Sequence, residues 1–210
     1  MHGYAYRFLD DGLFDFVPPW YLEKVGARLP IAADLARLKW IESVLHTEDY
    51  DLVVWLDADT LIIEPDLLCL NVDEQHQFGL EFWLQRQDSK VRVYRNVHNA
   101  YCAFRPGDPL LPFLSFAVEH LVRQVDPEHL APQFVGPKLL TSLHNMLKLN
   151  TDARFGAISP LQTQAIIAGD QALLGQLAAS AAAPLMAANL CSSLISPDQA
   201  MALIDHLRPE

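Results

Sequence analysis

The chain has 210 residues, with 26 Asp and Glu against 15 Lys and Arg, and its formal net charge is -11 at pH 7. This length favours one domain, because a chain of this size can bury roughly 70% of its unfolded surface in a single core. Nucleic acids and anionic membranes attract proteins through clustered Lys and Arg, so the acidic composition argues against either as the main partner. We therefore expect a single domain over residues 1–210 and no nucleic-acid partner.

The cysteines and the N-terminal residues predict a cellular location. Cys69, Cys102 and Cys191 are far apart and form no CxxC pair, which is typical of reduced thiols in the cytosol. The first residues lack a basic and then apolar signal region, and no apolar run approaches the ~20 residues needed to cross a bilayer. The expected location is cytoplasmic.

The first predicted elements are a helix and a strand. In residues 31–46, IAADLARLKWIESVLH, apolar residues recur at helical spacing, and Asp34, Arg37 and Glu42 lie off that stripe. A short polar loop leads into residues 52–56, a continuously apolar run of the kind found in strands buried on both faces of a parallel sheet. This succession indicates an α/β architecture.

The rest of the chain continues the alternation. Strands are predicted at residues 78–83, 91–94 and 99–104. Helices are predicted to follow Asp108 and Pro109 and to lie at residues 136–148, 171–180 and 196–207, the last with Ser196 and Gln199 as a capping-box start. We expect a mixed, mostly parallel sheet flanked by helices.

Two carboxylates, Asp57 and Asp59, come directly after the apolar strand. Residues two apart in an extended chain point to the same side, so both can converge beyond the strand's end, where open α/β sheets bind ligands. Adjacent carboxylates repel one another unless a cation lies between them, and their oxygens favour Mg²⁺ or Mn²⁺. Roughly one or two Asp-x-Asp matches are expected by chance, so a turn or helix-cap role remains open. A second match, Asp49 and Asp51, lies in a polar loop and is interpreted as a solvated turn.

The helix with Asp34 and Arg37, followed by the strand that runs into WLDADTLI, resembles the metal-binding core of GT-A glycosyltransferases with a DXD motif. It is similar to the family 32-like sugar transferases, which include capsular polysaccharide enzymes, and to the galactosyltransferase/mannosyltransferase family whose motif region reads WLDADA. The stretches HNAYCAFRPGD and FVGPKLLTSLHN support the resemblance, the second through a similar GP..LT helix start. The resemblance covers residues 32–145.

The resemblance implies metal-dependent transfer of a sugar from a UDP- or GDP-sugar to a glycan or other small acceptor, with retention of the anomeric configuration. In such enzymes the strand-end aspartates hold a divalent ion, Mn²⁺ or Mg²⁺, that bridges the donor diphosphate. Many GT-A enzymes take a third metal contact from a C-terminal His or Asn. The metal ligands implied here are Asp57, Asp59 and Asn189.

The resemblance also implies that Asp34, Arg37 and Asn99 contact the donor sugar. Asp34 and Arg37 are three residues apart on the predicted helix, so an exposed ion pair is the alternative interpretation. No catalytic base is identified. Weaker candidates for the site, each of which is more often an ordinary structural residue, are Ser192, Ser193, His98, His144 and His206. The tryptophans Trp40, Trp55 and Trp83 are expected in the core, although an aromatic ring can also stack on a sugar face.

GT-A domains usually begin with a strand whose end holds the nucleotide base, followed by a helix. Residues 2–8 here look like the end of that helix and the strand after it, so the first strand is expected to be missing from the sheet. Either the chain starts late, or a strand of another subunit covers the exposed edge, as in a homodimer.

Two other classes of function remain open. WLDADTL approximates the signature of haloacid-dehalogenase phosphohydrolases, in which the first Asp, here Asp57, is the nucleophile and the second, Asp59, is a general acid. Against this, position 61 is Leu instead of Thr or Val, and no later acidic pair is evident. A non-catalytic glycosyltransferase-like binding protein is the other class, motivated by the missing first strand.

Overall fold

A computed structural model describes residues 4–70, 72–181 and 183–207. Its larger sheet has the strand order β1-β4-β3-β5, formed by β1 (Val53–Leu56), β3 (His76–Gln87), β4 (Lys90–Phe104) and β5 (Thr151–Asp152). β4 pairs antiparallel with both β1 and β3, and β5 pairs parallel with β3. The expected mixed sheet is confirmed, but the expectation of a mostly parallel sheet is wrong.

β1 is an edge strand, because within the described residues it pairs only with β4. Both of its faces are nevertheless packed. Val53 and Trp55 belong to an apolar cluster with α2, whereas Val54 and Leu56 pack in a second cluster around Phe155. Packing on two faces explains the continuous apolar run, although the neighbouring strand is antiparallel and not parallel as expected.

A smaller sheet has the strand order β2-β7-β6, formed by β2 (Thr60–Ile62), β7 (Ala187–Asn189) and β6 (Phe155–Ala157). β2 pairs antiparallel with β7, and β6 pairs parallel with β7. β1 ends at Leu56 and β2 begins at Thr60, so residues 57–59 form the turn that carries the chain from one sheet to the other. The predicted metal ligands Asp57 and Asp59 therefore lie at this junction.

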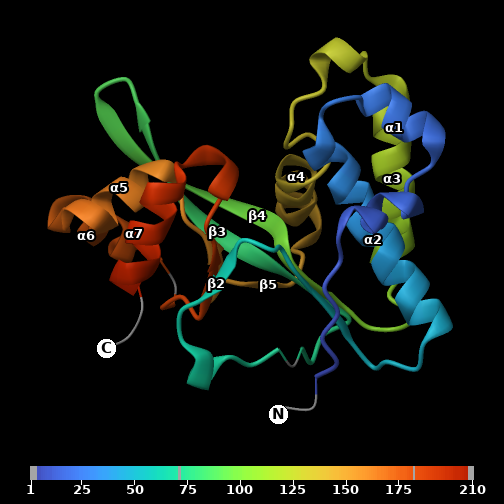
Figure 1. Cartoon of the computed structure of the whole chain (residues 1–210), viewed down its shortest axis with the longest axis horizontal. Coiled ribbons are helices and arrows are strands. Elements are labelled where there is room, and N and C mark those ends of the chain that lie inside the picture. The colour runs from blue at the N-terminus through green and yellow to red at the C-terminus, as the bar shows by residue number, and fades with distance from the viewer. Residues whose placement is uncertain (1–3, 71, 182, 208–210) are drawn as a thin grey trace.

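The helices form two groups, one on each side of the sheets (Figure 1). One group contains α1 (Pro19–Val25), α2 (Leu29–Thr47), α3 (Leu110–Gln124) and α4 (Pro137–Leu147), and the largest apolar cluster lies between it and the larger sheet. The other contains α5 (Pro160–Ala168), α6 (Gln171–Ser180) and α7 (Pro197–Leu207), of which α5 and α7 pack against the smaller sheet. None of the described helices is both long and apolar enough to cross a membrane.

Most predicted elements are present. The helices expected at 31–46, 136–148, 171–180 and 196–207 correspond to α2, α4, α6 and α7, and the reciprocal hydrogen bonds between Ser196 and Gln199 confirm the capping box. The strands expected at 91–94 and 99–104 are one continuous strand, β4. Residues 4–10 contain no helix or strand, so the interpretation of the N-terminal segment is wrong there, and its first residues lie outside the described part of the chain.

Candidate functional site

The inner side of α2 carries two charged residues. Asp34 and Arg37 are only 7% and 5% exposed. Being three residues apart, they lie on neighbouring positions of the helix, and Arg37 Nη1 lies 3.5 Å from Asp34 Oδ1. An exposed surface ion pair is therefore excluded, and both side chains belong to the interior beside the end of β1 and Asn99 within β4.

Arg37 is the centre of this buried group. Its Nη1 donates a hydrogen bond to the carbonyl oxygen of Asn99 at 2.8 Å, and its Nη2 donates to Asp57 Oδ1 at 2.8 Å. The guanidinium carbon lies 5.2 Å from the ring centroid of Trp55. Burial alone would lower the pKa of Arg37, but the carboxylates of Asp57 and Asp34 raise it above its ordinary value. Arg37 therefore supplies a permanent buried positive charge.

Asp34 links α2 to β4 and α4. Its Oδ1 accepts a hydrogen bond from Asn99 Nδ2 at 2.7 Å. Burial raises the pKa of Asp34 to about 6, although Arg37 and the Asn99 hydrogen bond oppose the shift. A Cβ atom at Gly136, the residue before α4, would lie 2.5 Å from Asp34 Oδ2. The GP..LT helix start seen in the sequence therefore requires glycine, because the backbone passes directly against Asp34.

Asp57 is fixed through one of its carboxylate oxygens. Asp57 Oδ1 accepts hydrogen bonds from Trp55 Nε1 at 2.6 Å and from Arg37 Nη2, and the Asp57 backbone N–H donates to the carbonyl oxygen of Ala100 at 2.8 Å. Its Oδ2 has no hydrogen-bond partner within the described residues, and the side chain is 27% exposed. Trp55, whose expected place was the core, therefore also orients this carboxylate, which keeps one oxygen open to a ligand.

Asp59 is held by residues far along the chain. Its Oδ1 accepts from Asn189 Nδ2 at 2.6 Å, and its Oδ2 accepts from both the backbone N–H and the hydroxyl of Ser192, each at 2.9 Å. The amide oxygen of Asn189 accepts from the backbone N–H of Cys191 at 2.8 Å. That N–H can only donate, so it fixes the amide of Asn189 with its nitrogen toward Asp59. In this structure Asn189 positions Asp59, and its role as a metal ligand stays a prediction.

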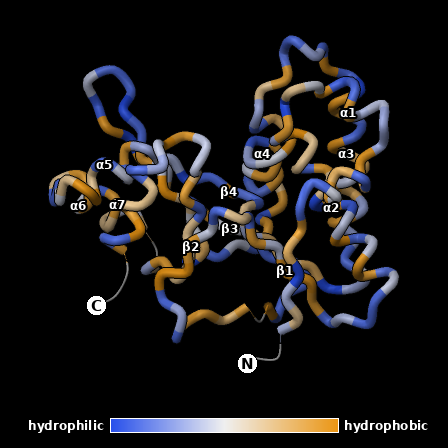
Figure 2. Tube along the Cα trace, viewed as in Figure 1, coloured by the Kyte–Doolittle hydropathy of each residue, from blue (hydrophilic) through white to orange (hydrophobic). Residues whose placement is uncertain are grey.

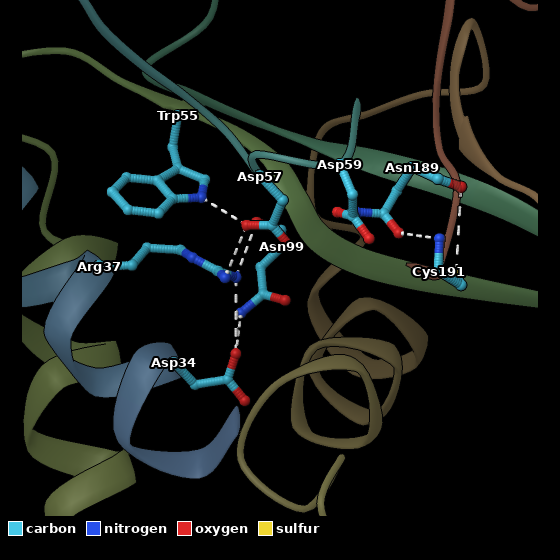
Figure 3. Close-up of polar contacts among 8 residues, drawn as sticks. All are labelled: Asp34, Arg37, Trp55, Asp57, Asp59, Asn99, Asn189 and Cys191. Carbon is cyan, nitrogen blue, oxygen red and sulfur yellow. Dashed lines mark hydrogen bonds and ion pairs between the residues drawn. The ribbon is translucent and has the colours of Figure 1, made fainter. Parts of the chain in front are cut away.

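All six predicted site residues thus belong to two hydrogen-bond networks that meet at the turn between β1 and β2 (Figure 3). One network joins Asp34, Arg37, Asn99 and Asp57, and the other joins Asp59 to Asn189. Figure 3 shows the two carboxylates of the turn extending from the same side of the chain. Within the described residues no group of three or more His, Cys, Asp or Glu could hold a metal ion, so the donors available here are two carboxylates.

A buried carboxylate on the larger sheet, that of Glu81, was not predicted as a site residue. Glu81 on β3 is 8% exposed and accepts a hydrogen bond from Asn96 Nδ2 at 2.9 Å. Burial raises the pKa of Glu81 to about 7. Burial, together with smaller contributions from the carboxylates of Glu81, Asp59 and Asp57, also raises the pKa of the Cys191 thiol to about 12. The signal in the sequence is an acidic residue within the apolar run GLEFWL.

The predicted histidine candidates have structural contacts instead. His98 is buried, its Nε2 donates to the carbonyl oxygen of Phe155 at 3.1 Å, and burial lowers its pKa to about 4. His144 and His206 each donate to a backbone carbonyl close by in sequence. No hydrogen bond within the described residues joins any of the three to Asp57 or Asp59.

Two cavities of the described chain differ in their position relative to the networks. A cavity of ≈ 520 Å³ lies between the start of β3 and the end of α4, lined by residues 74–76 and 148–151, and none of the six predicted residues lines it. The space enclosed by Thr60, His98 and Asn189 is too small for a water molecule. Neither of these two spaces therefore offers room for a ligand of Asp57 and Asp59.

Comparison of the chain with protein-family models, with curated proteins and with solved structures found no match. Its function must therefore be inferred from the geometry of the site.

Proposed function

We propose that the protein is a metal-dependent glycosyltransferase with a GT-A-like site, which transfers a sugar from a UDP- or GDP-sugar to a hydroxyl of a glycan or other small acceptor. The observation that supports this most is the meeting of two networks at Asp57 and Asp59. Their members come from α2, β1, β4 and β7, so residues distant in sequence are held at one sheet junction. Such construction is typical of a ligand site and would be unnecessary for an ordinary turn.

Asp57 and Asp59 would hold the Mn²⁺ or Mg²⁺ ion. Asp57 Oδ2 has no partner in the described residues, and the three hydrogen bonds to Asp59 leave it lone-pair capacity. Mg²⁺ is commonly bound by one or two protein carboxylates together with substrate phosphates, without a complete protein cage. Two carboxylates therefore suit an ion that is shared with a nucleotide diphosphate. When bound, the ion supplies Lewis-acid stabilisation of the charge on the departing diphosphate.

The other residues position these carboxylates and the donor. Arg37 and Trp55 hold Asp57 by Oδ1 and leave Oδ2 facing the ligand side. Asp34 is buried and holds the amide nitrogen of Asn99, whose Oδ1 has no partner within the described residues. Asn99 is therefore the group of this network best placed to accept a hydrogen bond from a donor-sugar hydroxyl. Fixing the groups before the donor binds reduces the reorganisation needed for transfer.

The test is a thermal-shift titration with UDP and GDP, with and without Mn²⁺. A nucleotide at about 100 times its dissociation constant should stabilise the native protein by about 2.7 kcal/mol, and only when the metal is present. Asp57→Asn and Asp59→Asn should abolish this shift. Asp49→Asn and Asp51→Asn, which change the exposed second match in the same way, should retain it. Loss of the shift in all four variants, or a shift that does not need metal, would contradict the proposal.

The same preparation separates the two other classes of function. Hydrolysis of a generic phosphate ester with an aspartyl phosphate trapped on Asp57 would favour the phosphohydrolase. Metal-dependent nucleotide binding without turnover of any UDP- or GDP-sugar would favour the non-catalytic binding protein. Metal-dependent transfer or hydrolysis of one nucleotide-sugar is the expected result.

A further inference from the structure

The hairpin of β3 and β4 carries a concentration of positive charge that the composition does not suggest. Four of the chain's 15 cationic residues lie within residues 86–95, and all four are exposed: Arg86, Lys90, Arg92 and Arg95. Within the described residues none of them takes part in an ion pair. The hairpin projects beyond the body of the molecule, and Figure 2 shows its outer part as predominantly hydrophilic. It therefore offers positive charge to a partner outside the fold.

The strand register divides these charges between two faces. Directly paired residues of antiparallel strands share a face, and successive residues alternate. One face, here called the Trp83 face, consists of the pairs Trp83–Tyr94, Gln85–Arg92 and Gln87–Lys90. The opposite face consists of the pairs Phe82–Arg95, Leu84–Val93 and Arg86–Val91. Each face therefore has two cations, but only the Trp83 face combines them with two aromatic rings and two amides.

The Trp83 face continues into the candidate site. The next pair along the same face is Glu81–Asn96, which lies directly inward of Trp83–Tyr94. Asn96 and Asn99 lie three residues apart on β4, and the side chain of Asn99 donates to Asp34, so the strand that carries this face leads directly into the Asp34 network. From Glu81 to Gln87 the strand extends roughly 20 Å at about 3.3 Å per residue. A surface of this length can accommodate an extended chain molecule.

We propose that the Trp83 face binds an acidic oligosaccharide, and, resting on the proposed function, that this oligosaccharide is the acceptor. Tyr94 is 37% exposed and Trp83 is half-buried, so each offers a ring surface to the apolar face of a sugar. The exposed amides of Gln85 and Gln87 both donate and accept hydrogen bonds, as sugar hydroxyls require. Arg92 and Lys90 pair with sugar carboxylates. The outermost residues, 87–90, are all polar, which favours this ligand over insertion into a lipid bilayer.

Binding of two acidic probes, tetragalacturonate and a hyaluronan tetrasaccharide, is to be measured by isothermal titration calorimetry at low salt, without metal or nucleotide. Maltotetraose is the neutral comparison, and a short single-stranded DNA is the comparison for nucleic acid. We expect at least one acidic probe to bind at least tenfold more tightly than maltotetraose and than the DNA. Failure of both acidic probes, or preference for the DNA, would overturn the inference.

The register supplies a matched control. One double variant, Lys90→Ala with Arg92→Ala, removes two positive charges from the Trp83 face. A second double variant, Arg86→Ala with Arg95→Ala, removes two positive charges from the opposite face. The first double variant should weaken binding of the acidic probe at least tenfold, and the second should weaken it less than threefold. Tyr94→Ala should also weaken binding, but the dependence of its affinity on salt concentration should stay close to that of the wild type. Equal losses of affinity in the two double variants would mean that the net charge of the hairpin determines binding, and would contradict a site on the Trp83 face. Far-UV circular dichroism checks that each variant is folded.

These measurements need neither donor nor metal, so their failure is distinguishable from failure of the proposed function. A protein that binds nucleotide with Mn²⁺ but neither acidic probe keeps the proposed function and loses this inference. A protein that binds an acidic probe through the Trp83 face but no nucleotide retains the glycan-binding surface and loses the transferase.

Discussion

Removal of Arg37 should have the largest effect on stability, because the buried carboxylate of Asp34 and the partly exposed carboxylate of Asp57 both depend on its charge. Arg37→Ala would leave Asp34 and Asp57 without their cation and should lower the free energy of unfolding by about 3–5 kcal/mol. Urea denaturation monitored by tryptophan fluorescence measures this loss. Arg37→Lys should recover only part of it, because an ammonium group lacks the planar fork that reaches Asn99 and Asp57 together.

Lys39 on the same helix is the matched control. Its ion pair with Glu119, at 3.0 Å, is partly exposed, so Lys39→Ala should change stability by less than about 1 kcal/mol. If Arg37→Ala were as mild as Lys39→Ala, the network around Arg37 would have no role in holding Asp57.

At the level of residues, the sequence predicted which side chains lie together better than it predicted how they are held. Asp57 and Asp59 were found because they follow an apolar strand, and their position depends on local backbone geometry. The spacing of Asp34 and Arg37 alone could not exclude a solvated pair, since their burial is decided by Asn99 and Asp57 from other elements. Glu81 was missed because its burial and its hydrogen bond from Asn96 arise only when β3 and β4 pair.

Among the elements, β3 has one position that only glycine can occupy. A Cβ atom at Gly79 would collide with the ring of His98 and lie 2.8 Å from the carbonyl oxygen of Phe155 on β6. Gly79→Ala should therefore lower the free energy of unfolding by about 1–3 kcal/mol by forcing the two sheets apart. Equilibrium denaturation gives the value.

The same substitution in α6 should have the opposite sign. A Cβ at Gly175 meets no atom within 4 Å, and alanine is favoured over glycine in a helix interior by up to about 1 kcal/mol. Gly175→Ala is therefore expected to stabilise the protein. Destabilisation by both variants would indicate that the loss at Gly79 does not come from the contact with His98 and Phe155.

The longer elements were predictable and the shortest were not. α4 and α7 have periodic apolar patterns, α6 begins after the capping residue Asp170, and α2 is long with apolar residues along most of its length. β2, β5, β6 and β7 have only two or three residues each and exist because neighbouring strands pair with them. The antiparallel direction of β4 beside β1 was not predictable either, since an apolar run packed on two faces has the same composition in either direction.

For the molecule as a whole, the buried titratable groups predict an unusual dependence of stability on pH. Burial raises the pKa of Asp34 to about 6 and that of Glu81 to about 7. At pH values between the ordinary pKa of each group and its raised pKa, the folded protein therefore binds more protons than the unfolded chain. Their contribution to stability is complete below about pH 4 and is lost as the pH rises to about 7. His98, with its pKa lowered to about 4, acts in the opposite direction and loses stability as the pH falls below about 6.5.

Glu81→Gln isolates one of these contributions. At pH 8 the variant should be more stable than the wild type by on the order of 2 kcal/mol, because a buried charge is removed. At pH 5, where Glu81 is largely protonated in the folded protein, the difference should nearly vanish. Urea unfolding at both pH values measures the two differences, and a gain that is the same at pH 5 and pH 8 would show that the charge of Glu81 is not its cause.

The hydrogen bonds that Asn189 and Ser192 donate to Asp59 determine when, during synthesis of the chain, this carboxylate can be fixed in place. Asn189 lies 130 residues after Asp59, and Ser192 lies further still. At roughly ten residues per second, a ribosome needs on the order of ten seconds after making the aspartate before it supplies these three donors. A nascent chain that already has its larger sheet therefore still lacks the donors that fix Asp59, and the proposed ion site should be among the last parts of the protein to form.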